Sequence, residues 1–343
     1  MNSKVIFFSA FMLLKIARSA SLLSQFDDIP KRTMLCVVFI RFSKPWAIEY
    51  LKSNIGYAGD YCTCWALMPY FPVTQAMLTT IESFNQTIRD HAALHHSKII
   101  YLLDNSSMHP QNQAVLYKGC LYADLLPYLS SYSRVWLIDE DFTFEGLNFK
   151  EYFGYWDYPG GPLQHTMVTQ GLVLGRIYFK YLNYNNSLWE SQRTNSSSTH
   201  LVAFPTSFIE IQAPILDAAF MKWWLINIQI PAITTLATTK IDRCHTWGFP
   251  HTWCFAAKQY LEEKGHKSDN ALACAVITGS SYTTHNDRKT MRHDEANSSF
   301  NRDGERVKLL YQALYPDLYA YRRDYLNDRK KWVYPKNFTT SSP

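Results

Sequence analysis

The stretch that most constrains this chain is residues 133–142, where four apolar residues lead directly into three acids. The apolar part, residues 135–138, is typical of a strand that is buried on both faces. Asp139, Glu140 and Asp141 follow it. Adjacent carboxylates repel one another, so a strand with this ending favours a cation between Asp139 and Asp141. The alternative is a solvated acidic loop or the start of a helix.

Asp139 and Asp141 form an Asp-x-Asp pattern at the carboxyl end of the predicted strand. Mg²⁺ and Mn²⁺ prefer such oxygens, and they often complete their coordination with water and substrate phosphates. In an open α/β sheet, ligands bind beyond the carboxyl ends of the strands. The pattern therefore predicts a divalent-metal site that takes a phosphate-bearing ligand.

Around this stretch, predicted strands alternate with predicted helices. Buried strands are expected at 34–40, 98–105 and 135–138, and helices at 45–51, 72–91 and 113–126. Residues 57–71 mix aromatics, cysteines and a proline without a clear period and receive no assignment. The alternation predicts an α/β fold with a mostly parallel central sheet flanked by helices.

The second half of the chain is less regular. A short strand is expected at 208–212, and Pro214 is expected to open a helix that continues to Ile226. A second helix is expected at 250–264, and a short strand at 275–277. Residues 287–307 are densely charged and predict a loop.

The N-terminal segment predicts the cellular location. Lys4 precedes an apolar run at 5–14 and then small residues at 17–20, which is the layout of a secretory signal. About ten apolar residues are too few to span a bilayer comfortably, although a membrane anchor is the alternative. Residues 1–20 are therefore predicted to be a signal peptide or a short signal anchor. We expect the protein in the secretory pathway (Golgi or ER lumen) or secreted, and at a membrane only if this segment stays uncleaved.

Glycosylation acceptors and cysteines agree with that location. Asn-x-Ser/Thr acceptors predict a glycoprotein, and six occur, at Asn85, Asn105, Asn185, Asn195, Asn297 and Asn337. The chain has seven cysteines, which allow up to three disulfides and leave one cysteine over. Cys62 and Cys64 lack the spacing of zinc ligands and are disulfide or core candidates.

Composition and absent motifs exclude several classes of protein. With 47% hydrophobic and 18% charged residues in 343, the chain is globular. A net charge of +5 with scattered Lys and Arg predicts no nucleic-acid partner. No G-x-G-x-x-G follows the first predicted strand, which disfavours a nicotinamide dehydrogenase. G-x-S-x-G and H-E-x-x-H are absent too, so serine-hydrolase and zinc-protease functions lack their usual motifs.

An ordered set of segments resembles a known family. Residues 135–141, then 208–214, then Trp247-Gly248, then 275–277 with His285 resemble the domain-of-unknown-function family 707. That family looks related to glycosyltransferases of the type-A fold. The resemblance implies a glycosyltransferase-like α/β domain at 34–292, followed by a charged C-terminal extension at 293–343.

The same resemblance implies a metal-dependent transferase. The donor would be a nucleotide sugar, and the acceptor a glycan or glycoconjugate. Asp139 and Asp141 match the Asp-x-Asp that holds Mn²⁺ or Mg²⁺ on the donor diphosphate, and His285 matches a late histidine that completes the metal site. The alternative for His285 is a solvated side chain.

Three further residues are candidates for the site. Glu210 is the candidate catalytic carboxylate that faces the acceptor, and its alternative is a structural hydrogen bond. Asp104, at the end of the 98–105 strand, is expected to face the nucleotide, unless it is a turn residue. Trp247 is expected to stack on the donor sugar, unless it is a core residue.

One departure from the family pattern raises a second hypothesis. Relatives commonly carry an acid two residues after the Trp-Gly pair, where this chain has Pro250. If that acid is the catalytic base, the chain would be a catalytically weak or inactive glycosyltransferase-like protein that binds carbohydrate or acts as a scaffold. Asp242 would replace the acid only if its loop brings it close.

Overall fold

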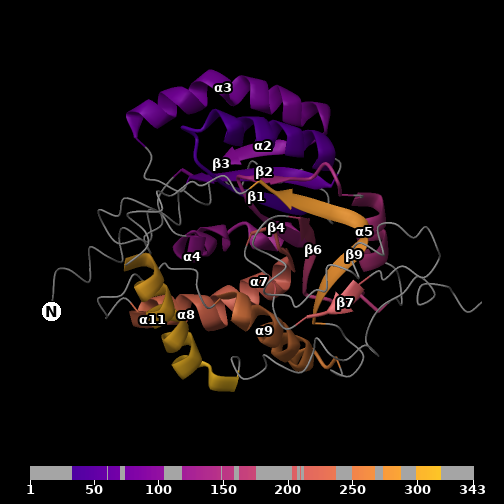
Figure 1. Cartoon of the computed structure of the whole chain (residues 1–343), viewed down its shortest axis with the longest axis vertical. Coiled ribbons are helices and arrows are strands. Elements are labelled where there is room, and N and C mark those ends of the chain that lie inside the picture. The colour runs from indigo at the N-terminus through magenta and orange to yellow at the C-terminus, as the bar shows by residue number, and fades with distance from the viewer. Residues whose placement is uncertain are drawn as a thin grey trace, which may run out of the picture.

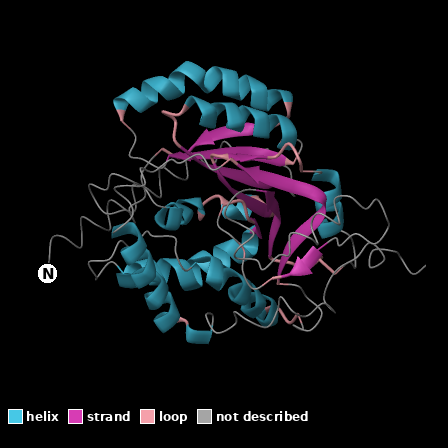
Figure 2. Ribbon diagram, viewed as in Figure 1, coloured by secondary structure: helices cyan, strands magenta, loops and turns pink. Residues whose placement is uncertain are grey.

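The chain forms one twisted sheet with helices on both faces (Figure 2). The structure is a computed structural model and describes residues 33–59, 61–69, 74–103, 118–147, 149–157, 162–174, 203–206, 209, 212–236, 249–266, 273–286 and 299–317. The strands are β1 (Met34–Ile40), β2 (Cys62–Pro69), β3 (Lys98–Tyr101), β4 (Arg134–Asp139), β5 (Phe142–Thr143), β6 (Val168–Leu174), β7 (Ala203–Pro205), β8 (Ile215–Asp217) and β9 (Cys274–His285).

The long strands of the sheet run parallel. The strand order is β3-β2-β1-β4-β8-β6-β9-β5, and β7 pairs with β9 off this path. Neighbours are parallel from β3 to β4 and again between β6 and β9, whereas the short strands β5, β7 and β8 pair antiparallel. The predicted α/β class with a mostly parallel central sheet flanked by helices is confirmed.

Strand β8 sets the direction of the second half of the sheet. It pairs antiparallel with β4 on one side and with β6 on the other. Strand β6 must therefore run in the same direction as β4, and β9, which is parallel to β6, does so too. As a result, the carboxyl ends of β1, β4 and β9 all lie at one edge of the sheet.

Two layers of helices cover the sheet (Figure 1). On one face lie α2 (Pro45–Ala58), α3 (Gln75–Leu94) and α5 (Phe149–Asp157). On the other lie α4 (Lys118–Leu121), α7 (Ala218–Trp224), the π-helix η5 (Leu225–Gln229), α8 (Ile230–Leu236), α9 (Phe249–Glu263) and α11 (Ser299–Leu314). Alternate residues of each central strand enter the two cores, since successive side chains point to opposite faces. In β4, Val135 and Leu137 join one core, whereas Trp136 and Ile138 join the other.

Most predicted elements are found in the described residues. The strands at 34–40 and 135–138 and the helices at 45–51 and 250–264 correspond to β1, β4, α2 and α9. The unassigned stretch 57–71 contains β2, which is buried on both faces between β1 and β3. A strand in that position carries no alternation of polar and apolar residues, so its pattern gives little signal.

The helix predicted from Pro214 is wrong over its first turn. Ile215–Asp217 form β8 and pair with strands on both sides. The helix α7 begins only at Ala218, where the Asp217 carboxylate accepts a hydrogen bond from the Phe220 amide at 2.8 Å. An aspartate cap of this kind marks the helix start more strongly than a preceding proline does.

The loop predicted at 287–307 is wrong for its C-terminal part, because α11 begins at Ser299. Val307 and Tyr311 of this helix are fully buried in the same core as α7 and α9. The Tyr311 hydroxyl also donates a hydrogen bond to the Gln229 side-chain oxygen at 2.9 Å. A single apolar stripe therefore docks an otherwise charged helix onto the domain.

The sequence signals for the secretory pathway fall largely outside the described residues. Residues 1–20 lie outside them, as do all the glycosylation acceptors except Asn85. Asn85 lies on α3, and its side-chain oxygen accepts a hydrogen bond from Arg89 at 2.7 Å. None of the helices that the structure describes has the length and apolar character to cross a bilayer.

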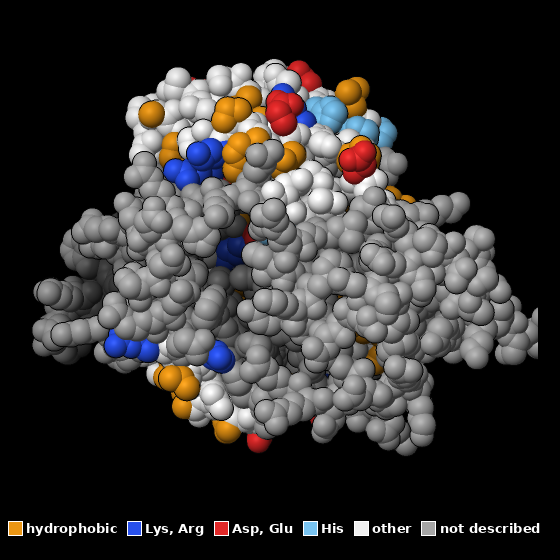
Figure 3. All heavy atoms as spheres, in the orientation of Figure 1, with side chains coloured by type: hydrophobic (Ala, Val, Ile, Leu, Met, Phe, Trp, Pro, Cys, Tyr) orange, Lys and Arg blue, Asp and Glu red, His pale blue; other side chains and the backbone are white. Residues whose placement is uncertain are grey.

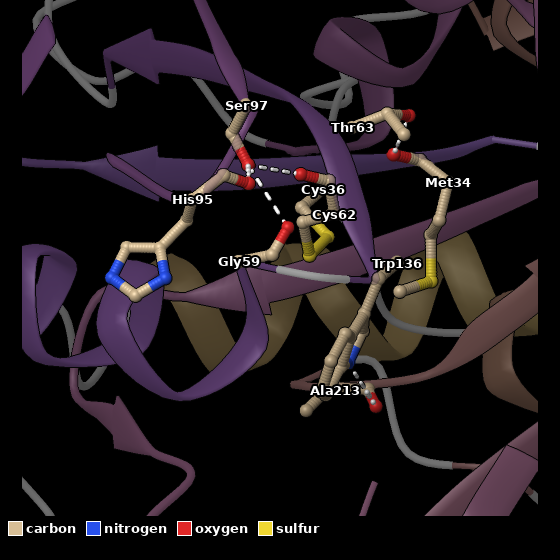
Figure 4. Close-up of a disulfide and its surroundings, with 9 residues drawn as sticks. All are labelled: Met34, Cys36, Gly59, Cys62, Thr63, His95, Ser97, Trp136 and Ala213. Atoms are coloured by element: carbon tan, nitrogen blue, oxygen red, sulfur yellow. Dashed lines mark hydrogen bonds between the residues drawn. A yellow bond between two sulfur atoms is a disulfide. The ribbon is translucent and has the colours of Figure 1, made fainter. Parts of the chain in front are cut away.

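Disulfides tie neighbouring elements together, and Figure 4 shows the one between β1 and β2. Cys36 pairs with Cys62, and Cys254 of α9 pairs with Cys274 of β9. Cys120 is also disulfide-bonded, and Cys64 is a buried free thiol. Both residues were expected to be disulfide or core candidates, and Cys62 is in a disulfide while Cys64 is in the core.

Replacing both Cys36 and Cys62 with alanine is expected to lower the free energy of unfolding by about 3 kcal/mol, because the bridge closes a loop of sequence separation 26. Cys64→Ala removes a buried sulfur from the same strand without breaking a bridge, so it controls for lost packing. Urea denaturation measures the free energy of unfolding of the wild type, the double variant and Cys64→Ala. If the double variant loses no more than about twice what Cys64→Ala loses, the crosslink contributes nothing beyond packing.

Candidate functional site

The candidate site lies at the edge where β1, β4 and β9 end. Asp139 is the last residue of β4, and a turn at Glu140 and Asp141 leads back into β5. Strand β5 then pairs antiparallel with the end of β9, so that Phe142 lies opposite His285. This return brings the acidic turn beside a histidine that is distant in the sequence.

Two asparagines hold the acidic turn in place. Asn54 of α2 donates to the Phe142 carbonyl at 2.8 Å and accepts from the Phe144 amide at 3.1 Å. Asn286, just after β9, donates to the Asp141 carbonyl from both its backbone and its side chain, each at 2.9 Å. Because the backbone is hydrogen-bonded from both sides, the acids are held in a defined arrangement.

Asp141 and His285 form a close pair. The distance between Asp141 Oδ2 and His285 Nε2 is 3.1 Å, and the two side chains are only 10% and 9% exposed. The Phe142 ring lies 5.0 Å from the imidazole, centroid to centroid. The carboxylate and the imidazole are thus both oriented and largely shielded from water.

Asp139 has a different partner. Its Oδ1 is in contact with Nζ of Lys118, the first residue of α4. The lysine side chain is 7% exposed, and its Nζ lies 5.3 Å from the centre of the Phe39 ring on β1. The sequence did not single out Lys118, because a lone lysine within the helix predicted at 113–126 carries no pattern that points to a site.

Glu140, between the two aspartates, is buried on the side of the turn that faces β1. Its Oε2 accepts a hydrogen bond from the Arg41 amide, which directly follows β1, and its Oε1 has no hydrogen-bond partner among the described residues. Burial raises the pKa of Glu140 to about 8, the Arg41 amide partly offsets that rise, and the neighbouring Asp139 and Asp141 charges add to it.

The Asp141–His285 pair fits two adjacent positions on a divalent ion. Ligand atoms at neighbouring corners of an octahedron with bonds of about 2.1 Å are about 3 Å apart, and the two donor atoms are separated by 3.1 Å. A carboxylate oxygen is a ligand that Mn²⁺ prefers, and an imidazole nitrogen binds divalent transition metals. No group of three His, Cys, Asp or Glu side chains suited to a metal occurs in the described part of the chain, and Asp139 is paired with Lys118.

The other predicted site residues lie outside the described ones. These are Asp104, Glu210, Trp247 and Asp242. Pro250 is the second residue of α9, a position where a helix tolerates proline because the amide has no partner there. Their predicted roles therefore stay predictions.

Basic and acidic side chains lie together near the centre of one face of the molecule. Figure 3 shows Lys or Arg atoms there with adjoining acidic atoms. Figure 1, in the same orientation, places α4 and β4 in this region.

Comparisons with known proteins give no family. No protein-family model matches the chain, and no curated protein matches its sequence. The resemblance to family 707 is therefore still an expectation.

Solved structures with a related arrangement are sugar-transferring enzymes. Glucosyl-3-phosphoglycerate synthase from Mycobacterium tuberculosis is 10% identical, with a TM-score of 0.37 and 82% of this chain and 79% of that chain covered. Galactosyltransferase LgtC is 9% identical, with a TM-score of 0.37 and coverage of 83% and 100%. Core-mannan synthase A from Aspergillus fumigatus is 9% identical, with a TM-score of 0.32 and coverage of 59% and 65%. At these TM-scores the likenesses do not decide what this chain does.

The raised pKa of Glu140 predicts a pH dependence of stability. The folded protein keeps a proton that the unfolded chain releases above its ordinary pKa of 4.5. This contribution is fully present below that value and is lost as the pH rises to about 8. In that window the free energy of unfolding is expected to fall by about 1.4 kcal/mol per pH unit.

The control is Glu140→Gln, which does not ionise. In chelator-treated protein this variant is expected to lack the Glu140 component of the pH dependence. Parallel pH profiles for the two proteins would mean that Glu140 is ionised when folded.

The two hydrogen bonds of Asn54, called the Asn54 clamp below, predict a measurable loss of stability when this residue is replaced. Asn54→Leu keeps the branched shape and the number of side-chain heavy atoms but leaves the Phe142 carbonyl and the Phe144 amide without this partner. The free energy of unfolding is expected to fall by about 2 kcal/mol. Thermal denaturation measures it, with the exposed Gln86→Leu on α3 as a control for the substitution itself. Equal effects at the two positions would contradict the clamp.

Proposed function

We propose that this protein is a metal-dependent glycosyltransferase that takes a nucleotide-sugar donor. The observation that carries the proposal is the Asp141–His285 pair at the edge where parallel strands end, with Asp139 two residues away on the same turn. Ligands of open α/β sheets bind at this edge. The resemblance to family 707 directs the choice among phosphate-bearing ligands to nucleotide sugars.

In this proposal each residue has a defined task. Asp141 and His285 hold the divalent ion, Mn²⁺ or Mg²⁺, and the acid turn is kept in register by Asn54 and Asn286. The ion supplies a Lewis acid for the negative charge that develops on the leaving diphosphate. Shielding of the pair from water strengthens its electrostatic interactions with the donor. The catalytic carboxylate is proposed to be Glu210, with Asp104 and Trp247 on the donor side.

The cellular setting is part of the same proposal. We infer a domain that acts on a glycan or glycoconjugate in the Golgi or ER lumen, or after secretion. The disulfides support an oxidising compartment, because such bonds persist there and are rare in the cytosol.

The test is calorimetric binding of UDP and GDP with and without Mn²⁺. The wild type is expected to bind one of them only with Mn²⁺, and Asp141→Asn and His285→Gln are each expected to weaken Mn²⁺ binding about tenfold or more. His165→Gln is the matched control, because this exposed histidine precedes β6 and so lies at the opposite edge of the sheet. Absence of any metal-dependent nucleotide binding would overturn the proposal.

Donor hydrolysis distinguishes an active transferase from the alternative, a catalytically weak or inactive protein. A transferase is expected to release the nucleotide from its matching nucleotide sugar in the presence of Mn²⁺, slowly even without an acceptor. Binding without release would favour the catalytically weak, carbohydrate-binding or scaffolding protein suggested by Pro250.

A further inference from the structure

The ion pair between Lys118 and Asp139 gives the two aspartates of the Asp-x-Asp different partners. Asp141 is paired with His285, whereas Asp139 is paired with Lys118. An ion held by Asp141 and His285 would attract the Asp139 carboxylate, but in this arrangement the ammonium group of Lys118 is in contact with it. Lys118 thus competes with the ion for one carboxylate.

The lysine is held in place by a buried polar chain. The carbonyl of Gly119, its neighbour in α4, accepts a hydrogen bond from the Gln229 side chain at 2.8 Å. Gln229 belongs to the π-helix η5 and accepts in turn from the Tyr311 hydroxyl of α11 at 2.9 Å. Gln229 and Tyr311 are fully buried, so the start of α4 is anchored from two other helices. π-helical turns frequently occur at functional sites.

Burial makes the partner of Lys118 important. Its side chain is 7% exposed and that of Asp139 is 15% exposed, so loss of either charge leaves the other poorly solvated. A bound diphosphate would offer the ammonium group a new anionic partner. With the diphosphate bound, Asp139 can move from Lys118 to the ion, because the buried lysine then has another anion as its partner.

We propose that Lys118 couples metal binding to donor binding. In the free protein it holds Asp139 away from the metal, and when the donor binds it turns to the diphosphate and releases Asp139 to the ion. This inference rests on the proposed function and adds its regulation. Metal and nucleotide then bind with positive cooperativity, and each raises the affinity of the other by the same factor.

The test measures the Mn²⁺ dissociation constant by calorimetry, alone and with saturating UDP or GDP, without any turnover. In the wild type, the nucleotide is expected to tighten Mn²⁺ binding roughly tenfold or more. Lys118→Gln is expected to tighten Mn²⁺ binding without nucleotide by roughly tenfold, because the ammonium group no longer competes for Asp139. The coupling factor is expected to fall well below that of the wild type and to keep only the part that comes from direct contact between the ion and the diphosphate.

The double variant Lys118→Gln with Asp139→Asn is the matched control, because it replaces a neutral pair with a neutral pair. Its Mn²⁺ affinity without nucleotide is expected to stay near that of the wild type, with the coupling reduced as in Lys118→Gln. The double variant also keeps the inference testable if Lys118→Gln alone fails to fold, since coupling as strong in the double variant as in the wild type would by itself overturn it.

Three other results would overturn the inference while the proposed function stands. These are unchanged Mn²⁺ affinity in Lys118→Gln, full coupling in that variant, and a gain in affinity that persists in the double variant. If the wild type binds neither nucleotide with Mn²⁺, the proposed function fails first and the inference fails with it.

Discussion

The structure depends on one short strand, β8, which runs antiparallel to both of its neighbours. Because of it, β6 and β9 point in the same direction as β1 and β4, and the carboxyl ends of all four reach one edge. Parallel strands on both sides of such a strand create a single edge for ligands. The approach of His285 and Asn286 to the acidic turn follows from that geometry.

The acidic turn shows how three consecutive acids tolerate a largely buried position. Each carboxylate has a partner from a different element: Asp139 has a lysine of α4, Glu140 a backbone amide that follows β1, and Asp141 the histidine that ends β9. Burial and mutual repulsion would otherwise favour protonation, as the raised pKa of Glu140 illustrates. The site is therefore arranged to receive positive charge before any ligand binds.

The parts of the fold that the sequence predicted are those with a strong local pattern. Strand β4 is a continuous apolar run and α9 has a proline start with a glycine stop, so both were predicted close to their observed bounds. Strand β8 was missed because a three-residue strand before a helix is too short to show a period, and β2 because it is buried on both faces. Helix α11 was missed because its charged residues conceal a narrow apolar stripe.

The sequence by itself determined that a buried strand ends in acids and that carboxylates gather where ligands of α/β sheets bind. Its resemblance to a family placed His285 in the same site, and the structure puts that residue against Asp141. Only the tertiary structure decided that Lys118 lies on Asp139. The physical reason is that a contact between distant residues depends on strand order and direction, whereas an apolar pattern specifies only which residues are buried.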